Sequence, residues 1–318
     1  SIFAHDGIVT SLALMRDSNK LVSIGSDKNI KLWNKKEGKI LFSFQIHKEN
    51  HRNNNPIYFG HIAVNQDETL LAIGDNTNSV TVFDIYTQNI VACCSHSEQG
   101  HQDWINAVAF NPQTPILVSV SDDNTLKVWD LSGKLINSIS FHSTHVKSVA
   151  FSPDGKYCAS ADRNGIIAIW NADDFSYISN ITTESGWINH IEFHPYAEFI
   201  LSAHGNGLVY IWDLQGNLIG RPLKGHDGWV NFASFSDDGN QIVSCGRDGT
   251  IRLWDSSNLK IDGYKEMIND ESDPVFINEQ LNKQLKIACH RLQNHPSYLE
   301  DNEISKGAQE ICKLWLSE

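Results

Sequence analysis

An all-β fold of repeated four-stranded antiparallel units is predicted by three features of this sequence. A set of residues recurs at fixed spacing through the first 264 residues. Within each copy, apolar residues alternate as in short strands, with Gly, Pro, Asn and Asp at the turns between them. Most copies end on Trp, often as Trp-Asp. Repeats of about 40–45 residues with these features are typical of β-propeller blades, so the predicted fold is a β-propeller.

The recurrence is counted from one anchor residue per copy. From His101, Phe110 lies nine positions on, Ser119 eighteen, Asp123 twenty-two and Trp129 twenty-eight. Three other histidines begin the same series, with Leu14 in place of the phenylalanine after His5 and Asn164 in place of the aspartate after His142. Two further copies keep the spacing but begin on Asn55 and Glu184. Because the interior spacing never changes, six blades are predicted, with anchors at residues 5, 55, 101, 142, 184 and 226.

Strands and turns can be placed inside the copies. In the third blade, strands are expected at 105–110, 116–120, 125–129 and 135–140. Ser152-Pro153-Asp154-Gly155 is the expected turn between the first two strands of its blade, and Asp248-Gly249 is the expected turn between the second and third. Each blade is therefore expected to contain four antiparallel strands.

Four of the recurring residues are predicted to form one buried polar cluster per blade. A buried indole N–H needs an acceptor, and the serine on the neighbouring strand can supply it. The histidine can bond the same serine, while the aspartate in the turn holds its other ring nitrogen and fixes the tautomer. The predicted structural residues are His5, Ser23, Asp27, Trp33, His101, Ser119, Asp123, Trp129, His142, Ser160, Trp170, Ser202, Trp212, His226, Ser244, Asp248 and Trp254.

A catalytic interpretation of the recurring Ser, His and Asp is disfavoured. A hydrolytic triad needs one exposed nucleophile in a pocket. Here the set is complete in three copies, each time beside a Trp. No catalytic residue is predicted, although a propeller enzyme or ligand-binding protein that uses a central channel stays open as an alternative.

The motifs Gly100-His101, Gly225-His226 and the Trp-Asp pairs at 129–130, 212–213 and 254–255 resemble those of the WD-repeat family. The resemblance covers residues 1 to about 264. It implies a structural His–Ser–Asp–Trp network at His5, His101, His142 and His226. It also implies that the blades that begin at Asn55 and Glu184 are less firmly held, because they lack the histidine of this network. The function it favours is a non-catalytic platform for binding proteins, with a constitutive scaffold subunit as the other interpretation.

The residues before the first repeat and after the last one are interpreted separately. Residues 1–3 align with the end of a fourth strand, which predicts upstream domains in a longer protein and an array of seven or more blades. The alternative is a six-bladed ring in which this short strand joins the last blade. Residues 265–318 are predicted to form a helical tail, with helices over 278–295 and 304–316.

The tail is similar to tails that follow WD arrays in large cyanobacterial proteins with an upstream signalling NTPase domain. This resemblance implies that the propeller is the recognition or sensor module of a signalling protein. Two cysteines and two histidines of the tail form a conceivable metal site, but their irregular spacing favours helix packing instead. They are Cys289, His290, His295 and Cys312. No metal or cofactor is predicted.

Composition excludes several partners and compartments. The net charge of −13 disfavours nucleic-acid binding, which relies on Lys and Arg. There is no apolar run of about 18 residues to span a membrane, and the N-terminus lacks the basic start and long apolar stretch of a signal peptide. The six cysteines show no C-x-x-C pair. A cytoplasmic location is therefore expected.

One face of the blades is predicted to bind the partner, because the anchors and the Asp-bearing turns must meet there. The anchors and the Asp-bearing turns form the rim of this face. The side chains three and five positions after each anchor are expected just inside the rim, together with the turn residue before the Asp position. Trp, Tyr and Arg are typical of binding hot spots, and the Lys and Arg residues favour an acidic or phosphorylated protein segment. The alternative is that the tryptophans pack on the next blade and the charges are merely solvated. The predicted partner-binding residues are Tyr58, Trp104, His145, Trp187 and Trp229, then Asn106, Lys147, Asn189 and Asn231, then Lys28, Asn76, Asp122, Arg163 and Arg247.

Overall fold

The computed structural model describes residues 5–7, 9–15, 19–46, 59–94, 99–196 and 198–257. All regular structure in these residues is β, arranged as antiparallel sheets that correspond one to one with the six predicted repeats. The prediction of an all-β fold made of propeller blades is confirmed. The chain divides into two compact units, with the division between Val149 and Ala150.

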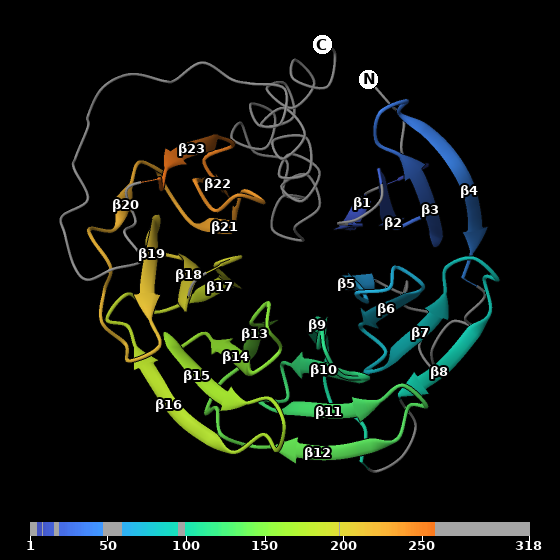
Figure 1. Ribbon diagram of the computed structural model, residues 1–318, viewed down its shortest axis with the longest axis horizontal. Helices are drawn as coiled ribbons and strands as arrows, with labels where there is room; N and C mark the ends of the chain where they lie inside the picture. The colour runs from blue at the N-terminus through green and yellow to red at the C-terminus, as the bar shows by residue number, and fades with distance from the viewer. Residues whose placement is uncertain are drawn as a thin grey trace. The chain divides into compact units, whose positions relative to one another are not determined.

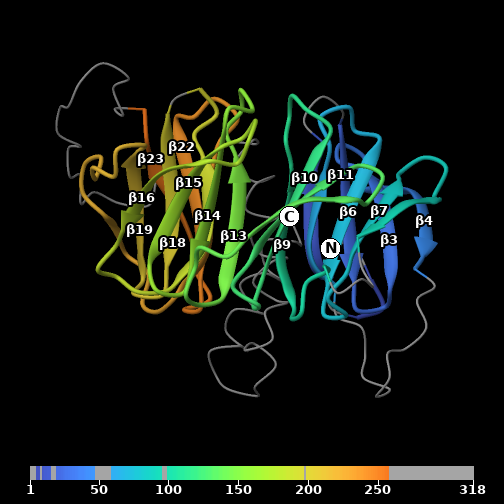
Figure 2. The ribbon, with the colours of Figure 1, turned by 90° about the horizontal axis from the view of Figure 1, so that it is seen from below.

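Unit 1 contains three four-stranded blades and the beginning of a fourth. Within each blade, the strands are hydrogen-bonded in chain order and lie side by side (Figures 1 and 2). The strands are β1 (Val9–Leu14), β2 (Lys20–Gly25), β3 (Asn29–Asn34), β4 (Lys39–Gln45), β5 (Phe59–Val64), β6 (Leu70–Asp75), β7 (Val80–Asp84), β8 (Ile90–Cys94), β9 (Ile105–Phe110), β10 (Ile116–Ser121), β11 (Leu126–Asp130), β12 (Leu135–Ile139) and β13 (Val146–Phe151), which crosses the division.

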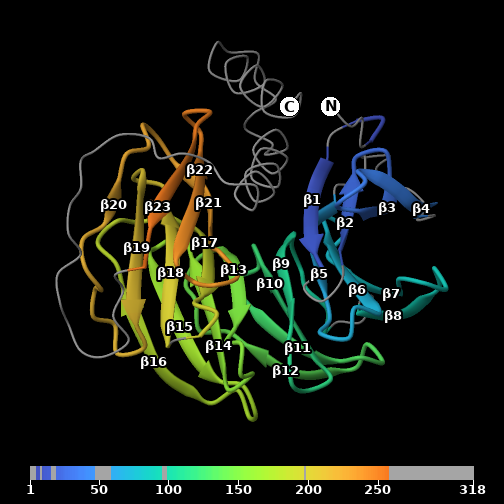
Figure 3. The same ribbon diagram turned by 45° about the horizontal axis from the view of Figure 1, so that its top comes forward.

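Unit 2 continues the fourth blade and contains the fifth and sixth. The sixth sheet has three strands within the described residues. The first strands of the last two blades, β17 and β21, lie next to each other (Figure 3). The strands of this unit are β14 (Tyr157–Asp162), β15 (Ile166–Asn171), β16 (Tyr177–Thr182), β17 (Ile188–Phe193), β18 (Phe199–His204), β19 (Leu208–Asp213), β20 (Leu223–Lys224), β21 (Val230–Phe235), β22 (Gln241–Gly246) and β23 (Ile251–Asp255).

Burial along the third blade shows where the core lies. Strand β10 is buried continuously from Leu117 to Ser121, as expected where both faces of a strand are covered. Strand β12 alternates between half-buried and exposed residues, so one of its faces meets solvent. Val82 of β7, Val108 of β9 and Leu117 belong to one apolar cluster. The core of unit 1 is therefore formed between successive blades.

The first strand of several blades carries a β-bulge at the fifth residue after the anchor. The register skips this residue between Ile188 and His190, and again between Val230 and Phe232. A bulge leaves one residue outside the ladder and redirects its side chain. The Nδ2 atom of Asn189 accordingly donates to the carbonyl of Val230 at 2.8 Å. In unit 1, Asn106 makes the same bond to Val146, also at 2.8 Å. Each of these asparagines thus ties its blade to the first strand of the next.

Some expectations fall outside the described residues: the strand remnant at 1–3, the helical tail at 265–318 with its Cys and His side chains, and Tyr58. Among the residues that are described, there is no helix with the length and hydrophobicity needed to cross a membrane.

Candidate functional site

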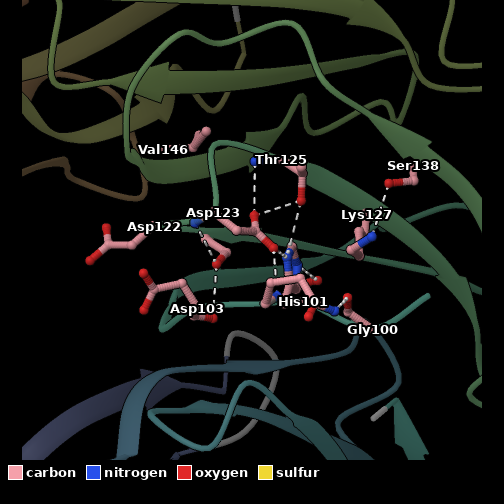
Figure 4. A network of polar contacts seen from close by, with 12 residues as sticks. Gly100, His101, Asp103, Asp122, Asp123, Thr125, Lys127, Ser138 and Val146 are labelled. Carbon is pink, nitrogen blue, oxygen red and sulfur yellow. Dashed lines mark hydrogen bonds and ion pairs between the residues drawn. The ribbon is translucent and has the colours of Figure 1, made fainter. Parts of the chain in front are cut away.

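The His–Ser–Asp–Trp sets of the first, third and sixth blades each come together. In the third blade, Nδ1 of His101 lies 2.8 Å from a carboxylate oxygen of Asp123, and Nε2 lies 2.8 Å from Oγ of Ser119 (Figure 4). The indole N–H of Trp129 donates to the same Oγ at 2.8 Å. The serine hydroxyl can then donate to Nε2, so the imidazole carries its proton on Nδ1, facing the carboxylate.

The equivalent distances in the other two complete sets are nearly the same. The distances from the histidine Nδ1 to the carboxylate, from its Nε2 to the serine Oγ and from the indole nitrogen to the same Oγ are 2.8, 2.7 and 2.8 Å for His5, Ser23, Asp27 and Trp33. For His226, Ser244, Asp248 and Trp254 they are 3.0, 2.8 and 2.9 Å.

Protonation in the third blade follows from burial and hydrogen bonding. Burial lowers the pKa of His101 more than Asp123 raises it, so the imidazole is neutral. For Asp123, burial opposes ionisation. Hydrogen bonds from His101, Thr125 and the Gln102 N–H outweigh burial, and the pKa of Asp123 is lowered. The three serines of the complete sets, Ser23, Ser119 and Ser244, are at most 1% exposed. A hydroxyl so deeply buried cannot reach a substrate, so these sets stabilise the blades.

The fifth blade uses a different histidine, which the sequence analysis missed. Glu184, at the anchor position, is exposed. His204, at the end of β18, is fully buried, and its Nε2 lies 2.7 Å from Oγ of Ser202. The Trp212 indole N–H donates to that Oγ at 2.8 Å, and Oγ of Ser185 lies 2.6 Å from Nδ1 of His204. The imidazole therefore enters the same cluster from a strand instead of from the anchor loop.

The complete sets explain why this exchange is possible. His204 lies twenty residues after the anchor, where the first and sixth blades have Gly25 and Gly246. A Cβ atom at Gly25 would lie 2.7 Å from the His5 ring, and one at Gly246 would lie 2.7 Å from Nδ1 of His226. In the first and sixth blades the anchor imidazole therefore fills the space that a side chain at this position would need, whereas the third blade has the small Ser121 there. The sequence signal was a histidine at this position in the copy that lacks an anchor histidine.

In the fourth blade the carboxylate has moved. Asn164 stands at the usual aspartate position, but the fully buried Asp162, two residues earlier, accepts from the Asn164 and Ile166 N–H groups at 2.9 and 3.0 Å. The Trp170 indole N–H donates to Ser160 at 3.0 Å, and His142 is buried beside Phe141. In the second blade, Asp75 accepts from the N–H of Thr77 in the corresponding turn.

Unit 2 brings four of the predicted partner-binding residues into one row. The rings of Trp187 and Trp229 meet at 71°, with centroids 4.6 Å apart. The guanidinium carbon of Arg163 lies 4.8 Å from the centroid of the Trp187 ring, and that of Arg247 lies 4.8 Å from the centroid of the Trp229 ring. A cation over an indole face at this distance is attracted by it. These four residues are called the Arg–Trp row below.

Gly205 makes room for the row. It occupies the turn position that is Arg163 in the fourth blade and Arg247 in the sixth. A Cβ atom there would lie 3.3 Å from Cβ of Trp187 and 3.9 Å from Cδ1 of Trp229. Within the described residues, neither arginine has a carboxylate partner. Their planar N–H groups, held by stacking, are therefore available to a ligand on a face where Trp187 is 39% exposed.

The corresponding rim of unit 1 has a different electrostatic character. One oxygen of Asp122 accepts from Nζ of Lys147 at 2.8 Å and from Nδ2 of Asn106 at 2.7 Å, and it lies 3.1 Å from Nδ1 of His145. Burial opposes ionisation of Asp122, but these partners outweigh it and lower its pKa. Lys147 is thus neutralised within the unit and does not supply the free positive charge expected of it.

The remaining predicted rim residues are placed as follows. Lys28 does not share the position of Arg163 and Arg247, because it follows Asp27 and adopts the left-handed conformation of the turn, with φ 62°. Asn76 is half-buried in the corresponding turn. Nδ2 of Asn231 is buried and has no hydrogen-bond partner within the described part of the chain. Among described residues, no group of three His, Cys, Asp or Glu side chains could hold a metal ion.

Comparison with known proteins places the chain in a family. The family model described as IFT122 first beta-propeller matches residues 9–289. Similar proteins include Striatin-3 of Bos taurus, 28% identical over 187 residues, which are 57% of this chain and 23% of the relative. MST50-interacting protein 11 of Pyricularia oryzae is 26% identical over 217 residues, 56% of this chain and 69% of the relative. WD repeat and SOCS box-containing protein 1 of Takifugu rubripes is 31% identical over 125 residues, 38% of this chain and 28% of the relative.

This chain thus spans about a quarter of the length of the striatin relatives that it matches. The repeat spacing, the blade structure and the family match agree. The chain belongs to the WD-repeat β-propellers, in the family of the IFT122 first beta-propeller.

Proposed function

We propose that this chain is a non-catalytic protein-interaction platform, and that the Arg–Trp row of unit 2 binds an acidic or phosphorylated segment of the partner. The observation that carries the proposal is the pair of stacked guanidinium groups without carboxylate partners. Stacking holds each guanidinium in place, so fewer rotamers are lost when its N–H groups bind an anion.

The character of the row fits a binding surface better than a packing contact. Trp and Arg are enriched among residues that dominate binding energy. On a chain with a net charge of −13, the two arginines place positive charge on one rim, which favours encounter with an anionic partner. One of the similar proteins is itself named as an interacting protein. The recognition module of a larger cytoplasmic signalling protein is the role we propose for the platform.

A peptide array tests this function. The full chain is probed against acidic, phosphorylated and basic peptides of matched length. We expect retention of the acidic and phosphorylated sets and its loss in the Arg163→Ala/Arg247→Ala variant. Arg221→Ala, which removes an exposed arginine elsewhere in unit 2, is the control and should retain them. Binding that is indifferent to peptide charge would contradict the proposal.

A further inference from the structure

We infer that Trp104 of unit 1 is a second binding site and that it binds the guanidinium group of an arginine of the partner. Its preference for a positive charge is opposite to that of the Arg–Trp row, which binds acidic segments. The indole of Trp104 is 47% exposed. It lies three residues after its anchor, the position that Trp187 and Trp229 hold in unit 2. Those two rings each carry an arginine, whereas the Trp104 ring has no cation or aromatic contact within the described residues.

The rest of the molecule shows which positions supply such a cation. Arg247 is the turn residue before the Asp position of its own blade, and it stacks on the Trp229 of that blade. Arg163 is the same turn residue of the preceding blade, and it stacks on Trp187 of the next. A tryptophan at this position can therefore receive its cation from either of two turns. For Trp104 the two turn residues are Asp122, in its own blade, and Asn76, in the preceding one. Neither is a cation.

The groups beside Trp104 carry the opposite charge. The Asp122 N–H donates to the Trp104 carbonyl at 2.9 Å, which holds the two residues together. One oxygen of Asp122 accepts from Lys147 and Asn106, while Oδ2 has no partner within the described residues. Asp103, on the other side, is exposed, and its Oδ1 accepts from the backbone N–H of Trp104 at 2.8 Å. The side chains of Asp103 and Asp122 both extend away from His101 (Figure 4).

An open indole face that is next in the chain to the exposed Asp103 carboxylate, with Oδ2 of Asp122 as a further acceptor, can bind a cation. The ring attracts the cation through its quadrupole, and a carboxylate oxygen with free lone pairs can accept from a guanidinium. Lys147 does not compete for the ring, because Asp122 and Asn106 already accept from its ammonium group. The occupant is an arginine of the partner, because the indoles at the same position in unit 2 are each covered by a guanidinium group, from Arg163 and from Arg247.

The test uses the full chain and two capped tripeptides, acetyl-Gly-Arg-Gly-amide and its citrulline counterpart, which has the same shape without the charge. The indole N–H signal of Trp104, assigned by its disappearance in Trp104→Phe, is followed by NMR during titration. We expect the arginine peptide to shift this signal with an affinity at least about fivefold above that of the citrulline peptide. In Trp104→Ala, binding is followed through the amide signals of neighbouring residues, and the affinity for the arginine peptide should fall by about the same factor of five.

Two further variants separate this site from other causes. Asn76→Arg places a cation where the preceding blade supplies one to Trp187, so it should occupy the ring internally and abolish the shift while Trp104 is retained. Tyr196→Ala removes an exposed aromatic side chain of unit 2 that belongs to neither site, and it should leave arginine-peptide binding unchanged. Equal affinity for the two peptides, or unaltered binding in Trp104→Ala, would overturn the inference. Binding of acidic peptides to the Arg–Trp row is measured separately and does not depend on this result.

Discussion

At the scale of the residue, the blades show that one buried imidazole can be supplied from two places in the chain. In three blades it comes from the anchor loop, and in the fifth it comes from His204 on a strand. The serine and the tryptophan keep their places in both arrangements. The hydrogen-bonding requirement of the buried serine and indole is therefore more constant than the position of the histidine.

This exchange predicts which histidines matter for stability. His101→Ala, His226→Ala and His204→Ala should each lower the free energy of unfolding by roughly 1–3 kcal/mol, because a buried hydroxyl or carboxylate loses its partner. Glu184→Ala should cost less than about 0.5 kcal/mol, since its side chain is exposed. Urea unfolding of the four variants measures this. Adding Glu184→His to the His204→Gly variant should restore part of the free energy of unfolding that His204→Gly alone loses. If the effects of the two substitutions on the free energy of unfolding are strictly additive, the side chains at positions 184 and 204 do not share one space.

The protonation of His204 predicts a pH dependence. Burial lowers its pKa from 6.5 to about 3, so the folded protein keeps it neutral where the unfolded chain protonates it. Its contribution to stability is complete above about pH 6.5 and is lost as the pH falls toward 3. Between pH 7 and pH 5 this amounts to roughly 2 kcal/mol. Urea unfolding at the two values should show a smaller drop for His204→Gln than for the parent, and equal drops would place the titration elsewhere.

At the scale of the element, the bulged first strand joins one blade to the next. The side chain of Asn189 reaches a backbone carbonyl of the following strand only because the bulge turns it out of the ladder. Asn231 holds the same bulge position, but its buried Nδ2 has no acceptor within the described residues. The two residues therefore form a matched pair, one with the inter-blade bond and one without it.

Asn189→Ala should lower the free energy of unfolding by about 1–2 kcal/mol, because the Val230 carbonyl loses a buried donor. Asn231→Ala removes no bond within the described part of the chain and should cost clearly less. Thermal melts of both variants under one buffer condition make the comparison. A loss at Asn231 as large as that at Asn189 would show that its amide does have an acceptor, outside the described residues.

Part of the buried clusters could be predicted from the sequence. Repeat spacing predicted which side chains meet in the first, third and sixth blades, because each of those copies contains all four members of the set. It missed His204 and Asp162, whose positions hold glycine or serine in the complete copies. It also grouped Lys147 with Arg163 and Arg247 as residues that make the rim basic. The pairing of Lys147 with Asp122 depends on side-chain directions in two successive blades, which spacing along the chain does not determine.

At the scale of the whole molecule, the chain is strongly acidic, and two arginines without a carboxylate partner among the described residues, Arg163 and Arg247, lie on the rim of unit 2. Charge and aromatic surface should then act on different steps of binding. Rim charges mainly speed encounter, and their effect is screened by salt. A desolvated tryptophan mainly slows dissociation. The two kinds of residue in the Arg–Trp row can be separated kinetically.

Stopped-flow binding of the tightest acidic peptide from the array shows whether the Arg–Trp row is the partner site. Arg163→Glu with Arg247→Glu should slow association and weaken its salt dependence. Trp187→Ala or Trp229→Ala should speed dissociation, with a loss of about 2 kcal/mol or more where the ring is a hot spot. Arg221→Ala serves as the control and should change neither rate. This division between the two rates is the expected result. Peptide binding that is the same in all these variants and the parent would show that the Arg–Trp row is not the partner site.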